Sequence, residues 1–197
     1  MNIVRPGNYV KLFKIGTVFV LMSLGGMAAA QAACPSPDTL KARSLDRHFV
    51  QEKYFSGMDQ PLRSEGQMTA QGDEIVWHML KPFDVKTTIS QSGITQSVSG
   101  GEETPVAAAS GRMAGSIAKS LAAVMRGEWT ALKAVFDVER PASKDDGDWE
   151  VRLTPHDERL ATIMGKITVR GCEDVSSVDF GSSQDNREHI EFSATGS

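Results

Sequence analysis

Two cysteines, Cys34 and Cys172, are the residues whose chemistry this sequence constrains most. Cys34 directly follows Ala32-Ala33, the position at which a bacterial lipoprotein carries its lipid-modified first residue. Such signals usually have an aliphatic residue three positions before the cysteine, where this chain has Gln31. The alternative is a disulfide, which forms readily in the oxidising periplasm. We therefore predict a Cys34–Cys172 disulfide, and lipidation of Cys34 is the alternative that stays open.

No other residues form a recognisable catalytic or metal-binding pattern. None of the four histidines has another ligand at metal-site spacing: His48, His78, His156 and His189. His156-Asp157-Glu158 is typical of the polar entry to a short helix, and Ser182-Ser183 lacks the glycines that flank a nucleophilic serine. Acidic residues follow Gly100-Gly101 and would repel a phosphate. We expect no catalytic residue, metal or cofactor, and an enzyme of apolar substrates is the least favoured alternative.

The first 33 residues have the composition of a cleaved export signal. A basic start precedes an apolar run at 15–22, and a stretch rich in glycine and alanine follows at 25–33. The apolar run is shorter than the roughly 20 residues that a membrane-spanning helix needs. We predict a signal peptide at 1–33 and a single domain at 34–197, located in the periplasm.

The charge of the predicted mature chain excludes some classes of partner. The leader holds three of the 21 basic residues and none of the 25 acidic ones, so the remainder carries a formal charge of −7. Nucleic acids and anionic phospholipid headgroups are normally bound by basic patches. The sequence therefore predicts no nucleic-acid partner, and we expect a monomer.

Apolar residues recur at two different spacings in the mature chain. A spacing of two residues predicts strands, and a spacing of three to four residues predicts helices. Turn signals separate extended segments in the first half, at hairpin spacing: Phe49–Phe55, Leu62–Ala70, Glu74–Leu80, Val85–Ile89 and Ile94–Val98. Three segments are predicted as helices, one starting at Ser36-Pro37 and running to about Arg47, one at Ala109–Arg126 and one at Asp157–Met164.

Strands return after the long helix and alternate cleanly between apolar and polar residues. Trp149, Val151 and Leu153 fall on one face, whereas Glu150 and Arg152 fall on the other. Further strand signals with the same period lie around Phe136, Ile167, Val178 and Ile190. We expect an α+β fold, in which a strongly curled antiparallel sheet of about ten strands forms a half-barrel and about three helices cover its apolar concave face.

Five short motifs in this order resemble the LolA/LolB lipoprotein carriers over nearly the whole mature chain. They are Phe49-Val50-Gln51-Glu52-Lys53, Leu62-Arg63-Ser64-Glu65-Gly66, the segment from Ile75 to Pro82, Ser92-Gly93, and the segment from Trp149 to Pro155, which ends in Leu153-Thr154-Pro155. The resemblance implies a half-barrel with a helical lid, whose apolar interior shelters acyl chains in transit through the periplasm.

Three departures from that family point to a divergent member with one cargo. Gln71-Gly72-Asp73 stands where the carriers commonly have an arginine and a proline that latch the lid. Ile94-Thr95-Gln96-Ser97 replaces the aromatic residues that usually follow the glycine turn. The chain also stops soon after Phe192, without the family's extra strand and Pro-rich tail.

The apolar face and the helix stripe together give the residues expected to line a cavity. Such residues are ordinarily core, but methionine and alanine in the stripe pack adaptably, and with the resemblance we expect a ligand cavity. Its predicted lining is Ile75, Trp77, Met79, Met113, Ile117, Leu121, Phe136, Trp149, Val151, Leu153, Ile167, Val169, Phe180 and Phe192.

The function that these expectations favour is a periplasmic carrier that shelters the acyl chains of lipoproteins or lipids on their way to the outer membrane. Its partners would be those acyl chains, an inner-membrane donor and an outer-membrane acceptor. The alternative is an accessory factor dedicated to one envelope lipid or polyene-pigment pathway, anchored through a lipidated Cys34.

Overall fold

The computed structural model describes residues 34–40, 45–71, 74–110, 112–141, 147–183 and 186–195, together with the first two residues. The predicted signal peptide lies almost wholly outside the described residues, so its cleavage stays a prediction. Ala33–Ser197 forms one compact unit. Within the described part of the chain, no helix is both long enough and apolar enough to cross a bilayer.

The described residues of this unit form eleven strands and four helical segments. The strands are β1 (Arg47–Tyr54), β2 (Leu62–Gln71), β3 (Glu74–Lys81), β4 (Val85–Ile89), β5 (Gly93–Val98), β6 (Thr104–Ser110), β7 (Phe136–Glu139), β8 (Trp149–Pro155), β9 (Ile167–Gly171), β10 (Val175–Ser183) and β11 (Asn186–Ala194). The helical segments are the 3₁₀ turn η1 (Pro37–Thr39) and the α-helices α1 (Arg112–Arg126), α2 (Trp129–Leu132) and α3 (Glu158–Met164).

All eleven strands belong to one antiparallel sheet, in the order β6-β5-β4-β3-β2-β1-β11-β10-β9-β8-β7. The sheet therefore consists of two meanders, β1 to β6 and β7 to β11, which meet where β1 pairs with β11. That pairing runs from Arg47 opposite Ala194 to Tyr54 opposite Arg187. The predicted α+β class with an antiparallel meander is thus confirmed, with eleven strands in place of about ten.

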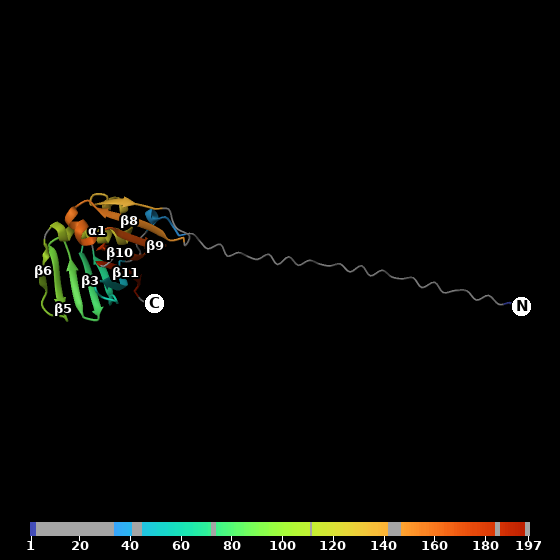
Figure 1. The fold of residues 1–197 in the computed structure, drawn as a ribbon, viewed down its shortest axis with the longest axis horizontal. Coiled ribbons are helices and arrows are strands. Elements are labelled where there is room, and N and C mark those ends of the chain that lie inside the picture. The colour runs from blue at the N-terminus through green and yellow to red at the C-terminus, as the bar shows by residue number, and fades with distance from the viewer. Residues whose placement is uncertain are drawn as a thin grey trace. The chain divides into compact units, whose positions relative to one another are not determined.

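The prediction that the sheet curls strongly into a half-barrel is wrong. The sheet is open, with β6 and β7 as its two edges, and it is not strongly curled. Figure 1 shows α1 against one face of the sheet, where it packs on the strands β3 to β6. We call this the covered face and the opposite one the outer face. Because helices shield the apolar side chains, the sheet does not have to wrap around itself to hide them.

The predicted end of the first helix and the predicted start of the long helix are wrong, because both relied on local helix propensity. The first helical segment ends at Thr39 as a 3₁₀ turn, and Arg47 begins β1; residues 41–44 lie outside the described part. Ser36 does cap this turn as predicted, since its side chain accepts from the Asp38 N–H. The long helix begins at Arg112, because pairing with β5 draws the preceding alanine-rich segment into β6 despite its helix propensity.

The predicted alternation of faces is confirmed for the second meander. Trp149, Val151 and Leu153 are buried on the covered face of β8, whereas Arg152 points to solvent. Ile167 and Val169 repeat this pattern on β9. Burying one face of each strand fixes the register, since a slip of one residue would expose every apolar side chain.

A glycine allows the first meander to pack closely at the centre of the sheet. A Cβ atom on Gly66 would lie 2.0 Å from the backbone oxygen of His78 on β3, so no other residue fits without moving a strand. The register between β2 and β3 also shifts at Glu65–Gly66. This irregularity is a bulge, which locally bends a strand and increases its twist.

Candidate functional site

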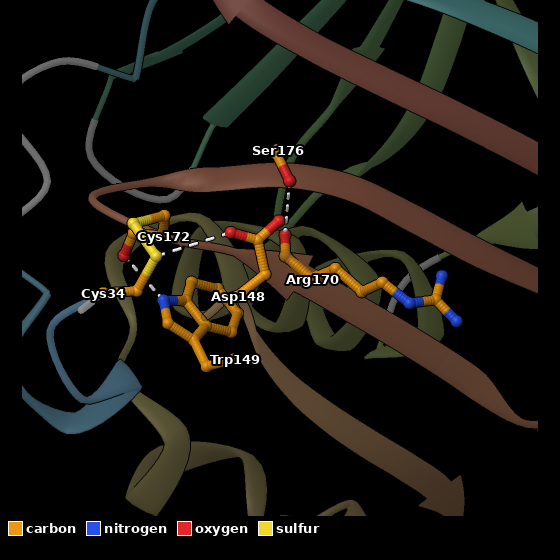
Figure 2. The surroundings of a disulfide bond; sticks show 6 residues. All are labelled: Cys34, Asp148, Trp149, Arg170, Cys172 and Ser176. Carbon is orange, nitrogen blue, oxygen red and sulfur yellow. Dashed lines mark hydrogen bonds between the residues drawn. A yellow bond between two sulfur atoms is a disulfide. The ribbon is translucent and has the colours of Figure 1, made fainter. Parts of the chain in front are cut away.

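A disulfide between Cys34 and Cys172 closes one end of the covered face, as predicted. Figure 2 shows it beside Trp149, whose indole N–H donates a hydrogen bond of 2.6 Å to the backbone oxygen of Cys172. Asp148 Oδ1 lies 3.4 Å from Cys34 Sγ. A sulfur held in a disulfide cannot also carry a thioether-linked lipid, so this structure favours the disulfide over lipidation of Cys34.

Cys34, Asp148 and Cys172 form the one group of potential metal ligands among the described residues. Their ligand atoms lie within 4.8 Å of one another. Metals bind the thiolate form of cysteine, and the disulfide uses both sulfurs. The arrangement therefore serves to hold the chain together, with no thiolate free for an ion.

Two tryptophans pack against each other beside the disulfide and form part of the hydrophobic core at this end of the covered face. Trp129 of α2 packs edge-on against Trp149, with ring centroids 5.9 Å apart. The Trp129 indole N–H donates to the backbone oxygen of Pro37 at 2.8 Å, and Arg140 contacts Asp38 at 2.5 Å. The segment that follows the predicted cleavage region is thus fixed to the body by a covalent bond, a hydrogen bond and an ion pair.

A cavity of about 490 Å³ lies on the covered face, between the sheet and the helices α1 and α3. Its lining side chains are Gln51, Trp77, Ser116, Ile117, Ser120, Leu121, Val124, Val135, Phe136, Leu153, Asp157, Leu160, Met164, Ile167, Val178, Phe180, Glu188, Ile190 and Phe192. A volume of a few hundred cubic ångströms and a mainly apolar wall are typical of sites for small molecules.

The structure divides the predicted site residues into two groups. Those that line the cavity are Trp77, Ile117, Leu121, Phe136, Leu153, Ile167, Phe180 and Phe192. Those that pack into or against the solid core instead are Ile75, Met79, Trp149, Val151 and Val169. Met113 lies in α1, and its side chain is outside the described residues.

Aromatic stacking builds the wall of the cavity where the two meanders meet. The ring of Trp77 on β3 stacks on Phe49 of β1, with centroids 3.9 Å apart. Phe192 of β11 meets Trp77 edge-on at 6.2 Å. Phe49 is fully buried, so it supports the two rings that face the cavity. Contacts of this kind restrict the positions of large side chains and keep the wall in a defined shape.

The helix α1 supplies the opposite wall with small and medium-sized side chains. Ile117, Leu121 and Val124 face the cavity at helical spacing, and Ser116 and Ser120 lie beside them. Ala118, Ala122 and Ala123 of α1 are buried. Lys119, on the other side of the helix, is exposed. The predicted apolar stripe therefore covers the sheet but leaves space beneath its middle.

Polar groups at one end of the cavity were missed by the sequence analysis. Glu188 of β11 accepts a hydrogen bond of 2.5 Å from the Gln51 side-chain amide, and its other carboxylate oxygen lies 2.6 Å from Lys53 Nζ. The Glu188 side chain is only 15% exposed. These polar residues occupy the positions of the alternating pattern that point to the covered face, because Gln51 pairs with Ile190 and Lys53 with Glu188. Extending the alternation past Ile190 would have found them.

Asp157 is the second carboxylate on the cavity wall. It caps α3, as the polar sequence at this point predicted, and its Oδ1 accepts from the backbone N–H groups of Arg159 and Leu160 at 2.9 and 3.0 Å. Both acidic side chains of the lining thus have structural partners. Among the described lining residues there is no lysine, arginine or histidine.

The outer face of the second meander carries a network of ion pairs. Arg170 lies 3.1 Å from Glu150 and 2.5 Å from Asp179, and His189 Nδ1 lies 2.7 Å from Asp179. Partial burial opposes protonation of His189, but hydrogen bonds and charges from Asp179 and Glu191 outweigh it and raise the pKa of His189 above its ordinary value. The network lies across β8 to β11 on the face away from the cavity.

Comparison with models of known protein families finds none that matches this chain, and comparison with curated protein sequences finds no match either.

Proposed function

We propose that this protein is a carrier that shelters an acyl chain in the cavity between α1 and the sheet. The observation that carries the proposal is the cavity of about 490 Å³, whose walls are mainly aromatic and aliphatic. Each methylene group transferred from water to such a wall contributes about 0.8 kcal/mol, with little dependence on direction. This chemistry suits binding and release of an unreactive chain.

The acidic residues of the wall support binding without catalysis. Glu188 is engaged by Gln51 and Lys53, and Asp157 is engaged by the start of α3. Among the described lining residues, no histidine, lysine, cysteine or tyrosine is present to act with these carboxylates as a catalytic pair.

Exposed apolar side chains at the ends of the hairpins are a second supporting observation. They are Phe55, Met58, Leu62, Leu80, Phe83 and Val98, and Phe83 is the most exposed of them at 70%. Strand pairing places Leu62 opposite Lys53, and Lys53 opposite Glu188, so this rim and the polar end of the cavity share one end of the sheet. Clusters of exposed apolar residues commonly contact partners or membranes. We propose this end as the place of cargo transfer.

We propose that this activity takes place in the periplasm, and the LolA/LolB resemblance and the predicted export signal support this part of the proposal. The disulfide is consistent with an oxidising compartment. The cargo would then move from an inner-membrane donor to an outer-membrane acceptor.

A variant that fills the cavity tests the proposal. Leu121 lines the cavity on α1, so Leu121→Trp should reduce the affinity for an uncharged, environment-sensitive apolar dye by at least about tenfold without lowering the melting temperature much. The matched control is Lys119→Trp, which adds the same ring to the exposed side of α1 and should bind the dye as wild type does. If the wild type has no saturable site, or if Leu121→Trp binds the dye unchanged, the proposal is wrong.

A further inference from the structure

We infer that the cavity selects acyl chains whose polar end is uncharged and rejects chains that end in a free carboxylate. This inference rests on the proposed function and adds to it the chemical class of the ligand. It depends on the contacts of Glu188 at the polar end of the cavity.

The ionised groups that face the cavity are anionic. Its described lining contains Glu188 and Asp157 but no basic residue. Lys53 is paired with Glu188, with Nζ 2.6 Å from its carboxylate, and it does not belong to the lining. A ligand chain lying against Trp77 and Phe192 therefore meets a carboxylate oxygen and an amide at this end.

A carboxylate head would have to approach Glu188 directly or remove Lys53 from it. Two carboxylates at close range repel each other, and in a partly buried site water screens that repulsion poorly. Removing Lys53 would leave a side chain that is only 15% exposed without its cationic partner. Both routes cost free energy that an uncharged head does not lose.

An uncharged head that carries hydroxyl or amide N–H groups suits the same residues. Glu188 accepts hydrogen bonds, and the Gln51 side-chain amide beside it both donates and accepts them. An ester or amide of an acyl chain therefore finds partners here. The acyl chains of lipids and lipoproteins are held in such linkages, whereas a free fatty acid is ionised at neutral pH.

The test compares two ligands with the same chain, dodecanoate and monododecanoylglycerol, by displacement of an uncharged apolar dye at neutral pH. The wild type should bind monododecanoylglycerol at least about tenfold more tightly than dodecanoate. Glu188→Gln keeps the shape of the side chain but leaves Lys53 without its anionic partner. This variant should lose the preference for the neutral ligand or reverse it.

Glu150→Gln is the matched control, because Glu150 is also a mostly buried carboxylate in ion pairs, with 21% of its side chain exposed, but lies on the outer face. It should keep the wild-type preference. Lys53→Met is a second variant, which leaves the Glu188 carboxylate in place and should strengthen the rejection of dodecanoate; it answers the question if Glu188→Gln does not fold.

The possible results separate the two proposals. If wild type binds dodecanoate as tightly as monododecanoylglycerol, the inference about the head group is wrong while the carrier function stands. If the preference exists but is unchanged in both Glu188→Gln and Lys53→Met, the assignment to this polar end is wrong. If neither ligand displaces the dye and the dye itself does not saturate, the carrier function is wrong.

Discussion

At the scale of single residues, the Cys34–Cys172 disulfide makes a prediction that mass spectrometry can check directly. The mature protein should be lighter than its reduced form by two hydrogen atoms and should carry no acyl group. The bond joins cysteines 138 positions apart, and a loop of that length corresponds to roughly 3–5 kcal/mol of stability in the chain-entropy model. The Cys34→Ala/Cys172→Ala variant should therefore unfold at a lower denaturant concentration. A mature mass increased by a diacylglycerol and a fatty acid would show lipidation instead.

Trp149 gives a test of which face of the sheet is buried. Trp149→Ala should lower the free energy of unfolding by about 3–5 kcal/mol, because it removes a large buried ring and the donor to Cys172. Lys166→Ala, at an exposed position just before β9, should cost under about 0.5 kcal/mol. Equal losses in urea denaturation would mean that the register of the second meander is wrong.

His189 predicts how stability depends on pH. Its pKa is higher in the folded protein than in the unfolded chain, so its protonated form stabilises the fold. This contribution is fully present below the unfolded pKa of about 6.5 and is lost as the pH rises through the folded pKa. Because the side chain is partly exposed, we expect the effect to be at most about 1 kcal/mol. His189→Gln should therefore cost more stability at pH 5.5 than at pH 9, and the opposite order in paired melts would contradict the ion-pair geometry.

At the scale of elements, the proposed carrier function requires α1 to cover the apolar face yet move aside for cargo. Ile117→Asp places a carboxylate on the covering side of the helix and should weaken its closed position without touching the hydrogen bonds of the sheet. Stopped-flow mixing with an uncharged apolar dye should show faster binding and faster release than in wild type. Lys119→Asp, on the exposed side of α1, is the control and should change neither rate.

One result of the Ile117→Asp experiment would contradict a lid function of α1. If Ile117→Asp lowers the melting temperature sharply and gives no saturable dye binding, the helix completes a solid core and is no lid.

Strong period-two patterns were predictable from the sequence, and short or mixed elements were not. Trp149, Val151 and Leu153 could be placed on the buried face because apolar and polar residues alternate without interruption along this strand. The four-residue helix α2 is too short to show a period, and β6 contains an alanine run that favours helix until β5 pairs with it. Neither element could be derived from local preference alone.

At the scale of the whole molecule, tertiary packing decides which apolar residues enclose a cavity and which form core. From the sequence, Trp149 and Trp77 are both predicted to line the cavity. Trp149 packs edge-on against Trp129 beside the disulfide, whereas Trp77 lies beneath the hollow under α1. That difference depends on the packing of helices against distant strands, which no local pattern records. The same applies to Glu188, whose role depends on Gln51 and Lys53 across the joint between the meanders.

The central claim is that the cavity holds one acyl chain, and native mass spectrometry tests it most directly. Wild-type mature protein incubated with monododecanoylglycerol should give a saturable complex of one protein with one ligand, and Leu121→Trp, which fills the cavity, should give little or none. Lys119→Trp should form the complex as wild type does. No complex with wild type, or an equal amount with Leu121→Trp, would contradict the account.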